Sequence, residues 1–512
     1  MVLSALLTLL AGLLHAASIA SPWDGQPVAW LQLLSMAVLA WRLDRSATPM
    51  QGAAHGWLFA WSWLAGTFWW LYVALHTYGG LAAPLTVIAV LLLAGLLALY
   101  YGAASWMFVR LKGRNPWASA VLFAALWMLS ELARGVWFTG FGWGAAGYAH
   151  VDGIGRSAAY VGAYGIAAFA ALIACLLAAW VRAPLQARNL ALLATAVSLS
   201  AALMWVPLAP TSATSTIDVA LLQGNIAQDE KFEPGTGVAD ALRWYGEQLG
   251  SATASLVVAP ETAIPLLPQQ LPAGYWEGLR KRFDSGKQAA LIGVPWGNAD
   301  QGYTNSVVGF KPSEPGKAPG TDYRYDKHHL VPFGEFIPPL FRWFTDLMSI
   351  PLGDFNRGAT GQASFEWRGE RLAPNICYED LFGEELAARF TDPARAPTIF
   401  VNISNIGWFG KTVALDQHLQ ISRMRSLEFG RPFIRATNTG DTVIIDHNAR
   451  VTHALERHAR GLLLGTVQGR EGITPFAWWA SRFGLWPLWV IGVLVVVLSA
   501  LRKRAGASKE AP

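Results

Sequence analysis

Charged residues and cysteines are both scarce in this chain. Of its 512 residues, 14% are Asp, Glu, Lys or Arg, and the only cysteines are Cys175 and Cys377. Two cysteines, one of them inside an apolar run, exclude a disulfide framework and the common cysteine-based metal sites. We therefore expect no metal and no cofactor.

Apolar residues are abundant instead. Hydrophobic residues make up 53% of the chain, which contains 25 tryptophans. Many of them occur in runs of about twenty residues, the length that crosses a bilayer. The formal net charge of +5 comes from basic residues in short loops between these runs and not from one basic face, which excludes nucleic-acid binding. The composition is typical of a membrane protein.

Eight apolar runs predict eight transmembrane helices. The first run lacks the basic n-region of a signal peptide and is followed at once by further runs, so we expect it to be retained as a helix. The predicted spans are Val2–Ala20, Val28–Trp41, Gly56–Leu75, Ala82–Val109, Trp117–Leu132, Ser157–Val181, Ala191–Pro207 and Phe483–Leu501.

Basic residues in the loops predict the orientation. Lysine and arginine cluster after spans two, four, six and eight and are sparse in the alternate loops, where Arg134 and Arg156 follow span five. Because cytoplasmic loops carry the excess of Lys and Arg, we expect both termini in the cytoplasm. The region between spans seven and eight then lies in the periplasm, if the host is a Gram-negative bacterium. The clustered residues are Arg42, Arg45, Arg110, Lys112, Arg114, Arg182, Arg188, Arg502, Lys503, Arg504 and Lys509.

Short apolar runs alternate with polar helical stretches between spans seven and eight, which predicts an α/β domain with a largely buried sheet. The predicted strands are Val219–Asn225, Ser255–Ala259, Ala289–Val294, Ser306–Phe310, Arg371–Ile376, Thr398–Ser404, Phe433–Thr437, Thr442–Asp446 and Leu462–Thr466. The predicted helices are Val238–Leu249, Gly274–Phe283, Glu384–Arg389 and Gln417–Phe429.

These patterns divide the chain into four parts. Helices 1–7 occupy residues 1–210, the α/β domain residues 217–470, helix 8 residues 480–502, and a cytoplasmic tail residues 503–512. Pro207–Ser215 is a plausible hinge between the membrane part and the α/β domain.

Cys377 lies between a strand-like run and a helix-like stretch with acidic residues in its first turn. Considered alone, a single cysteine is more often a small buried apolar residue. At a strand-to-helix turn, however, helix N-terminal N–H groups favour the thiolate, the nucleophilic form of the side chain. Cys377 is therefore a candidate nucleophile.

Glu261 and Lys327 are its candidate partners. Four apolar residues lead into Pro260-Glu261, so Glu261 ends a buried strand, and we expect poor solvation to raise its pKa, as a general base or acid requires. A glutamate is more often a helix cap or a surface residue, and a lysine is more often solvated. Next to a cysteine, however, Lys327 would stabilise both the thiolate and an oxyanion.

His328 and His329 follow Lys327 directly and suggest a metal pair or a Cys–His dyad. Adjacent residues on a strand point to opposite faces, so we expect the two rings not to share a ligand, and we reject a metal site.

Two segments are rich in aromatic residues. Trp137–Trp143, after span five, suits an interfacial aromatic belt and a substrate-facing arm equally well. Phe333–Trp343 is the second aromatic-rich segment.

The order of these motifs is specific. A strand ending in Pro-Glu, then Asp326–Glu335 (DKHHLVPFGE), then Cys377–Asp380 (CYED) resembles the nitrilase superfamily with its Glu-Lys-Cys triad. With the flanking apolar spans, the whole chain resembles the membrane-embedded branch of that superfamily, the apolipoprotein N-acyltransferases of the bacterial inner membrane. Supporting stretches are Leu222–Ile226, Trp137–Phe141, Asn402–Asn405 and Gly472–Phe476.

The resemblance implies an αββα sandwich inserted between helices 7 and 8. It also implies a role for each matching residue. Glu261 would be the general base, Lys327 the stabiliser of thiolate and oxyanion, and Cys377 the nucleophile. Glu335, Tyr378 and Glu379 would support them, and the residues expected to contact substrate are Phe232, Trp137, Phe141, Trp143 and Trp408.

One stretch departs from the family pattern. The family typically has Asn-Asp-Ala-Trp-Phe-Gly where this chain has Asn405–Gly410 (NIGWFG), with Ile406 in place of the aspartate. This puts in doubt any role for that side chain but leaves the triad intact.

The implied reaction is acyl transfer through a thioester on Cys377, from the sn-1 position of phosphatidylethanolamine to the N-terminal amine of a diacylglyceryl apolipoprotein. The implied partners are therefore a phospholipid, an apolipoprotein and the membrane, and we expect a monomer. Two alternatives stay open. One is a membrane-tethered amidase or nitrilase that hydrolyses a small amide, and the other is a catalytically inactive lipid-binding protein.

Overall fold

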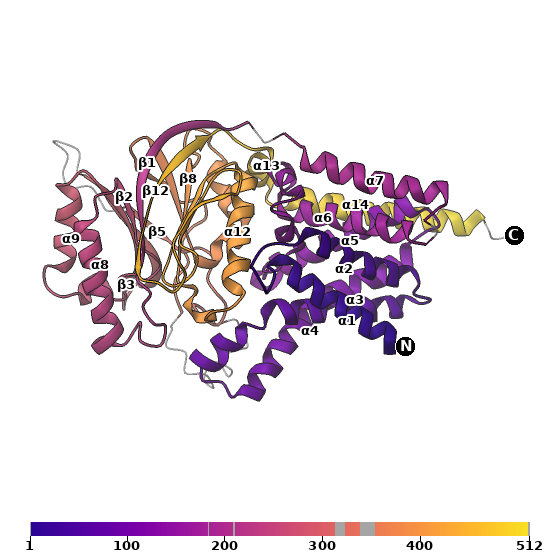
Figure 1. Cartoon of the computed structure of the whole chain (residues 1–512), viewed down its shortest axis with the longest axis horizontal. Helices are drawn as coiled ribbons and strands as arrows, with labels where there is room; N and C mark the ends of the chain where they lie inside the picture. Colours follow the sequence, from indigo (N-terminus) through magenta and orange to yellow (C-terminus); the bar gives the residue numbers. More distant parts are fainter. Residues whose placement is uncertain (1, 183, 208–209, 313–322, 338–353, 510–512) are drawn as a thin grey trace.

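The computed structural model describes residues 2–182, 184–207, 210–312, 323–337 and 354–509. A helical bundle and an α/β sandwich lie end to end, and both termini are at the far end of the bundle (Figure 1). The described helices of the bundle are α1 (Val2–Ile19), α2 (Ala29–Asp44), α3 (Pro49–Phe68), α4 (Ala83–Leu111), α5 (Pro116–Val136), α6 (Ala158–Trp180), α7 (Ala187–Met204) and α14 (Trp486–Lys509).

Every predicted span corresponds to one of these helices, but not every helix has the length and hydropathy of a span. Among the described residues, six helical segments are long and apolar enough to cross a membrane, and α2 and α3 are not among them. Helix α2 has only 16 residues, and α3 ends at Phe68, where a π-helical turn, Val73–Tyr78, soon follows. The predicted third span, Gly56–Leu75, is therefore wrong at its carboxyl end.

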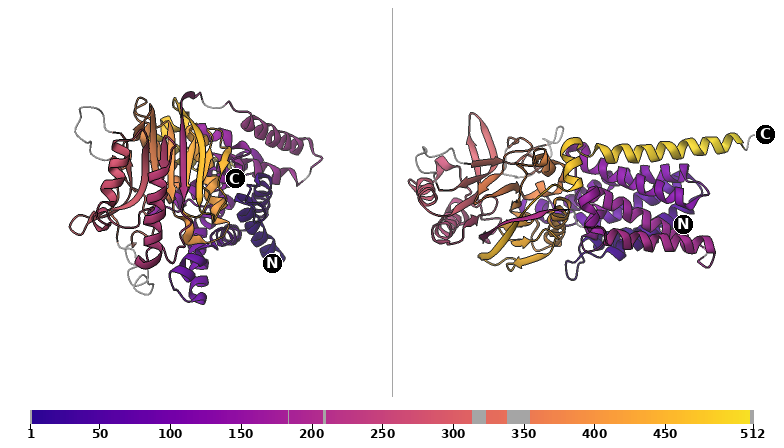
Figure 2. Two further views of the ribbon diagram at one scale, coloured as in Figure 1. Left: turned by 60° about the vertical axis from the view of Figure 1, so that its left-hand side comes forward. Right: turned by 90° about the horizontal axis from the view of Figure 1, so that it is seen from above.

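Local chemistry explains where several helices begin. Helices α3, α4 and α5 each carry proline in the first turn, where its missing N–H costs nothing. Thr48 caps α3, and the Asn115 side chain accepts backbone N–H groups at the start of α5. Seen from above, α14 runs along one edge of the bundle (Figure 2), and it packs mainly on α5.

The α/β part is a sandwich of two six-stranded sheets. The first has the order β12-β1-β2-β3-β4-β5 and the second the order β11-β10-β9-β8-β7-β6. The strands are β1 (Ser212–Gln223), β2 (Leu256–Val258), β3 (Ala289–Asn298), β4 (Gly302–Phe310), β5 (Tyr323–Asp326), β6 (Phe365–Trp367), β7 (Glu370–Ile376), β8 (Ile399–Ser404), β9 (Phe433–Thr437), β10 (Val443–Ile445), β11 (Val451–Ala454) and β12 (Gly461–Glu471).

Helices cover the outer face of each sheet. Helices α8 (Ala239–Ser251) and α9 (Tyr275–Asp284) pack on the first sheet, and α11 (Gly383–Ala387), α12 (Ala414–Phe429) and α13 (Pro475–Phe483) pack on the second (Figure 1). A third apolar cluster, which includes Leu221, Val258 and Ile403, fills the space between the sheets. These layers are the αββα sandwich that the resemblance implied.

The described part of the chain also contains three strands that the sequence did not predict. β5, β6 and β11 have four, three and four residues, and each mixes charged or polar residues with aromatic or aliphatic ones. Such runs are too short to show a reliable period-two pattern. They are added to the sheets only because β4, β7 and β10 offer them backbone partners.

Helix α12 connects the sandwich to the bundle. It stands between β8 and the bundle (Figure 1), and 14 of its 16 residues are buried. The Gln417 side-chain oxygen accepts the indole N–H of Trp143 at 2.7 Å and that of Trp70 at 3.0 Å, and Arg423 forms an ion pair with Asp152. A helix with polar residues on all sides is stable here because both neighbours supply polar partners.

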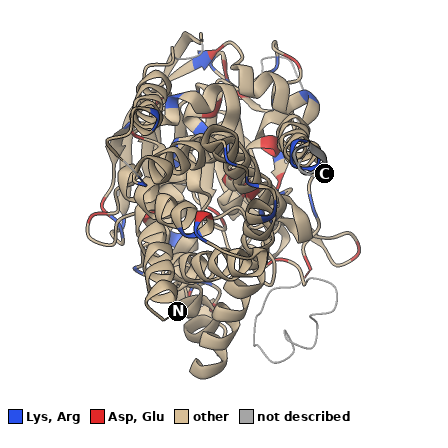
Figure 3. Cartoon of the chain, turned by 90° about the vertical axis from the view of Figure 1, so that its right-hand side faces the viewer, with Lys and Arg blue, Asp and Glu red and all other residues tan. Residues whose placement is uncertain are grey.

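The opposite end of the bundle carries basic residues. Figure 3 shows the chain from this end, where most of the helix ribbon is neither acidic nor basic. Asp44 at the end of α2 forms ion pairs with Lys112 and Arg182, and Lys503 donates to the Arg110 carbonyl. The Lys- and Arg-containing loops therefore gather at one end of the bundle, away from the sandwich.

Candidate active site

Cys377 lies in a strained turn directly after β7. Its φ is +52°, in the left-handed region that non-glycine residues rarely occupy. Asn402 on β8 donates its side-chain N–H to the Cys377 carbonyl at 3.0 Å, which holds the turn from the neighbouring strand. The chain then makes a 3₁₀ turn, Cys377–Leu381, before the five-residue α11. The helix predicted at Glu384–Arg389 is present as α11 followed by a 3₁₀ turn, Ala388–Phe390.

Glu261 and Lys327 meet in the interior next to this turn. Glu261 follows β2 and Lys327 follows β5, and their side chains are 9% and 1% exposed. The Lys327 Nζ lies 3.4 Å from Glu261 Oε1 and 2.8 Å from Glu335 Oε1. Asn305 on β4 donates to the same two oxygen atoms, at 2.7 and 2.8 Å. One ammonium and one amide therefore bridge two buried carboxylates.

The second Glu261 oxygen is also occupied. The backbone N–H of Asn405, just after β8, donates to Glu261 Oε2 at 2.7 Å. Residues after strands of both sheets thus contribute to one cluster. In parallel strands the carboxyl ends lie at the same edge, where sheets of this kind commonly bind ligands.

The protonation states differ from those expected from sequence. Burial tends to raise the pKa of the Glu261 carboxyl, but the charge of Lys327 and the Asn305 hydrogen bond outweigh burial, so the pKa is lowered. The sequence prediction of a raised pKa is wrong because it counted the loss of water and not the cation and amide partners. Glu335 and Glu261 likewise outweigh burial at Lys327, whose pKa is raised.

The Cys377 side chain is a thiol in the resting protein. Burial raises its pKa to about 12, and the negative charge of Glu261 adds to this, while Lys327 and a hydrogen bond with Ser404 act in the opposite direction. The turn was expected to favour the thiolate, but burial outweighs that effect. Glu261 is ionised and Cys377 is protonated, so the pair is arranged for a proton transfer that accompanies nucleophilic attack.

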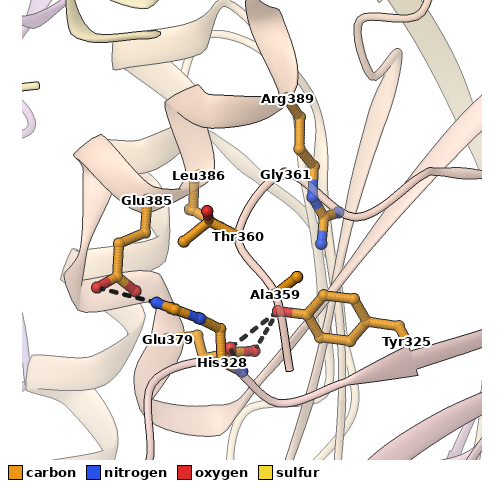
Figure 4. A pocket seen from close by; sticks show the side chains of 9 residues that line it. All are labelled: Tyr325, His328, Ala359, Thr360, Gly361, Glu379, Glu385, Leu386 and Arg389. Carbon is orange, nitrogen blue, oxygen red and sulfur yellow. Dashed lines mark hydrogen bonds and ion pairs between the residues drawn. The ribbon is translucent and has the colours of Figure 1, made fainter. Parts of the chain in front are cut away.

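Glu379 holds the turns that carry Lys327 and Cys377. Its two carboxylate oxygens accept the backbone N–H of Ile376 at 2.6 Å, that of His328 at 2.7 Å and the Tyr325 hydroxyl at 2.8 Å. These bonds join the end of β7 to the segment after β5. Glu379 and Tyr325 also line a pocket (Figure 4), and none of Glu261, Lys327 and Cys377 does so.

The two histidines do not point apart as predicted. β5 ends at Asp326, so His328 and His329 lie in a turn and not in a strand. His329 Nδ1 lies 2.9 Å from Glu385 Oε1, and His328 Nε2 lies 4.0 Å from the same oxygen (Figure 4 shows His328 and Glu385). The rule of alternating faces failed because it holds only for extended backbone.

Tyr378 connects the cysteine turn to the bundle. Its hydroxyl donates to the Gly140 carbonyl at 3.0 Å, and its ring belongs to the apolar cluster that the bundle helices form. Arg134 at the end of α5 donates to the Phe141 and Trp143 carbonyls, at 2.6 and 2.7 Å. The segment after α5 is therefore held on one side by the bundle and on the other side by the sandwich.

The aromatic residues of this segment fall into two groups. Trp143 is 2% exposed and Phe141 packs on Phe68, so both are packing residues at the junction. Trp137 is 52% exposed and stacks on Trp489, and Phe138, with a φ of +55°, is 91% exposed. The second group, Trp137 and Phe138, is called the aromatic rim below, and it follows the end of α5 that faces the sandwich.

The remaining candidates lie outside the cluster of Glu261, Lys327 and Cys377. Phe232 is 39% exposed, and Trp408 packs edge-on against Tyr78. Ile406, which replaces the family aspartate, is 2% exposed and belongs to the apolar cluster at the junction. The part of Phe333–Trp343 beyond residue 337 lies outside the described residues.

Sequence reasoning missed two residues that contact Glu261. Asn305 lies on β4 between Thr304 and Ser306, just before the predicted strand Ser306–Phe310, and a polar residue among polar neighbours gave no usable signal. Lys231 is 2% exposed, and its Nζ donates to the Glu261 backbone carbonyl at 3.0 Å. A lysine beside Asp229 and Glu230 gives no sign of burial in the sequence.

Comparison with known proteins decides the family. A profile of the apolipoprotein N-acyltransferase N-terminal domain matches residues 11–176, and a carbon-nitrogen hydrolase profile matches residues 218–474. An apolipoprotein N-acyltransferase of Verminephrobacter eiseniae is 59% identical over 499 residues, which cover 93% of this chain and 92% of the relative. The chain belongs to the apolipoprotein N-acyltransferase family.

Other relatives agree with this assignment. The apolipoprotein N-acyltransferase of Ralstonia nicotianae is 44% identical over 486 residues, 94% of this chain and 90% of the relative. Among solved structures, a Nesterenkonia amidase is 16% identical with a TM-score of 0.36, over 51% of this chain and 92% of that one. The family relationship therefore rests on the sequence relatives. This member is an N-acyltransferase and a multi-pass membrane protein.

Proposed function

We propose that this acyltransferase moves an acyl chain from the sn-1 position of a phospholipid, through a thioester on Cys377, to the N-terminal amine of a diacylglyceryl apolipoprotein. The observation that carries the proposal is the arrangement of an ionised Glu261, a charged Lys327 and a protonated Cys377 beside the apolar bundle. Phosphatidylethanolamine is the proposed donor, and this would be the last step of lipoprotein maturation.

In the first half-reaction Glu261 takes the proton from the Cys377 sulfur as that sulfur attacks the ester carbonyl. Lys327 and the backbone N–H of Tyr378 stabilise the oxyanion that forms. The ester C–O bond then breaks, Glu261 returns its proton to the glycerol oxygen, and a lysophospholipid leaves. Glu335 and Asn305 keep Lys327 and Glu261 in place, and Glu379 holds the two turns.

In the second half-reaction the amine of the acceptor attacks the thioester carbonyl. Glu261 accepts the proton that the amine loses, and the Cys377 thiol is restored. Both substrates carry acyl chains, whose transfer into water would cost about 0.8 kcal/mol per CH₂ group. A nucleophile next to the bundle avoids this cost.

The proposed topology has eight transmembrane helices in the inner membrane, including α2, which has 16 residues, and α3, which has 20 residues but a lower hydropathy than the other spans. The sandwich would lie in the periplasm between helices 7 and 8, with both termini in the cytoplasm, since the basic loops gather at the far end of the bundle. An impermeant thiol reagent should reach a cysteine placed at Lys287 in spheroplasts but not one placed at Lys503. The reverse labelling pattern would mean that the true orientation is the opposite of the proposed one.

Mass spectrometry of the purified protein tests the chemistry. After incubation with phosphatidylethanolamine, the peptide that contains Cys377 should gain one acyl mass, and lysophospholipid should appear. A diacylglyceryl lipopeptide should then remove that mass and become N-acylated. Release of free fatty acid without N-acylated peptide would instead show a hydrolase, and an unmodified protein with no product would show an inactive lipid-binding protein.

We also propose that the exposed aromatic rim receives the lipid donor and that Phe232 and Trp408 lie along its path. Phe138→Asp places a charge where an apolar chain would pass, so the KM for phospholipid should rise several-fold with kcat little changed. Leu185→Asp is the matched control, because Leu185 is also 91% exposed but lies at the basic end of the bundle. If both variants have the same KM and kcat for phospholipid, the aromatic rim does not contact the lipid donor.

A further inference from the structure

Two buried lysines approach Glu261, and they differ in their partners. Lys327 makes ion pairs with Glu261 and Glu335. Lys231, on the turn after β1, donates instead to the Glu261 backbone carbonyl at 3.0 Å. Among the described residues, no carboxylate lies within 4.0 Å of the Lys231 ammonium nitrogen.

The turn that carries Lys231 is closely packed. Gly237 lies against it, and a Cβ at Gly237 would come within 2.1 Å of the Glu230 carbonyl and 2.9 Å of the Lys231 Cα. Asp229 and Glu230 point to solvent, whereas Lys231 is 2% exposed. The turn therefore places one lysine side chain inside the protein and keeps its acidic neighbours outside.

Burial without a paired carboxylate favours the neutral amine. Desolvation lowers the pKa of Lys231 to about 7, and the charges of Glu261 and Cys377 only partly oppose this. The charged groups that act on it are Glu261 after β2 and Cys377 after β7, and Lys327 in turn lies 3.4 Å from Glu261 Oε1. A neutral amine can still donate the hydrogen bond to the Glu261 carbonyl.

We propose that Lys231 is a positioning residue for Glu261 that works as a neutral amine, and that protonation of Lys231 slows acylation of Cys377. The inference rests on the proposed function. The hydrogen bond fixes the backbone of the Glu261 turn, where Thr262 has a φ of +47°. This backbone conformation is strained, and the surrounding structure must maintain it.

The effect of protonation follows from where negative charge moves during attack. When the proton passes from the Cys377 sulfur to Glu261, negative charge leaves Glu261 and appears on sulfur. Of these two groups, Glu261 has the stronger electrostatic interaction with Lys231. A positive Lys231 therefore stabilises the reactant charge distribution more than the product, and proton transfer becomes less favourable.

The test is the pH dependence of the first turnover, measured as lysophospholipid released from phosphatidylethanolamine between pH 5.5 and 8.5. The wild-type rate should fall about tenfold per pH unit below about pH 7. Lys231→Met should be roughly tenfold slower at pH 8, because the Glu261 carbonyl loses its donor. Its rate should not fall further below pH 7, so the ratio of the two rates should shrink as the pH falls.

Lys231→Arg and Lys287→Met complete the design. The arginine stays charged at every pH, so its rate should be low and flat across the range. Lys287 is exposed on the sandwich, and its variant should keep the wild-type profile. A purely structural role would give Lys231→Met and the wild type a constant rate ratio at all pH values, and that result would overturn the inference.

The rate at which iodoacetamide alkylates Cys377, followed on the peptide that contains it, gives the same comparison of pH profiles between wild type and variants without lipid. A wild-type protein that releases no lysophospholipid would defeat the proposed function, while its alkylation profile would still test Lys231. If Lys231→Met does not fold, the pH profiles of Lys231→Gln and Lys231→Arg are compared with that of the wild type instead.

Discussion

Cys377→Ser should lower acyl transfer by roughly 10³-fold or more, the scale on which loss of a catalytic nucleophile acts in other covalent enzymes. A serine hydroxyl is a far weaker acid than a thiol. Glu261, whose pKa is lowered by Lys327 and Asn305 despite its burial, is a weak base for such a proton. The serine variant should therefore form neither an acyl-enzyme nor lysophospholipid.

Folding should be almost unaffected by this change. Cys377 is only partly buried, and serine can occupy the same left-handed backbone conformation, so we expect a change in unfolding free energy within about 0.5 kcal/mol. Cys175→Ser is the matched control, since Cys175 lies in α6 and its variant should keep full acyl transfer. A serine variant with more than a tenth of the wild-type rate would exclude Cys377 as the nucleophile.

Lys327→Met should have the second large effect, on both activity and stability. The methionine leaves Glu261 and Glu335 buried and facing one another, with only Asn305 bridging them. Removing one partner from a buried ion pair costs about 3–5 kcal/mol. Acyl transfer should also fall by roughly 10³-fold, because the proposed oxyanion loses the charged donor that Lys327 supplies.

A double variant separates the two effects of Lys327. In Lys327→Met/Glu335→Gln one uncompensated carboxylate is removed, so thermal or denaturant unfolding should show that a large part of the lost stability returns. Acyl transfer should stay at the level of the single variant. Recovery of activity together with stability would mean that Lys327 serves only the fold, and the proposed oxyanion role would then be wrong.

The sequence was sufficient for the elements whose signal is local. The apolar runs predicted the bundle helices, and the run before Pro260-Glu261 predicted β2, because burial length and side-chain period are visible along the chain. β5, β6 and β11 were missed, since short edge strands acquire their structure from a neighbour. Helix α12 was predicted as a helix, but its place between sandwich and bundle was not.

The candidate site shows the same division. The order of Glu261, Lys327 and Cys377 was enough to predict that they would meet. The pKa shift of Glu261 was predicted in the wrong direction, because it depends on Lys327, Asn305 and other groups that come from separate strands. The pKa shift of a buried group can change direction when a single charged partner is added. The sequence near that group does not show which partner it will have.

By itself, the sequence was enough to predict a membrane protein that contains an α/β domain, and to name the three residues that we propose for the chemistry. Hydropathy and short motifs are properties of consecutive residues, so the chain displays them before it folds. Only the tertiary structure decided that Cys377 rests as a thiol, that Lys231 reaches the Glu261 turn, and that α12 joins the sandwich to the bundle. Each of these depends on distances and burial among segments far apart in the chain, and such quantities exist only once the chain has folded.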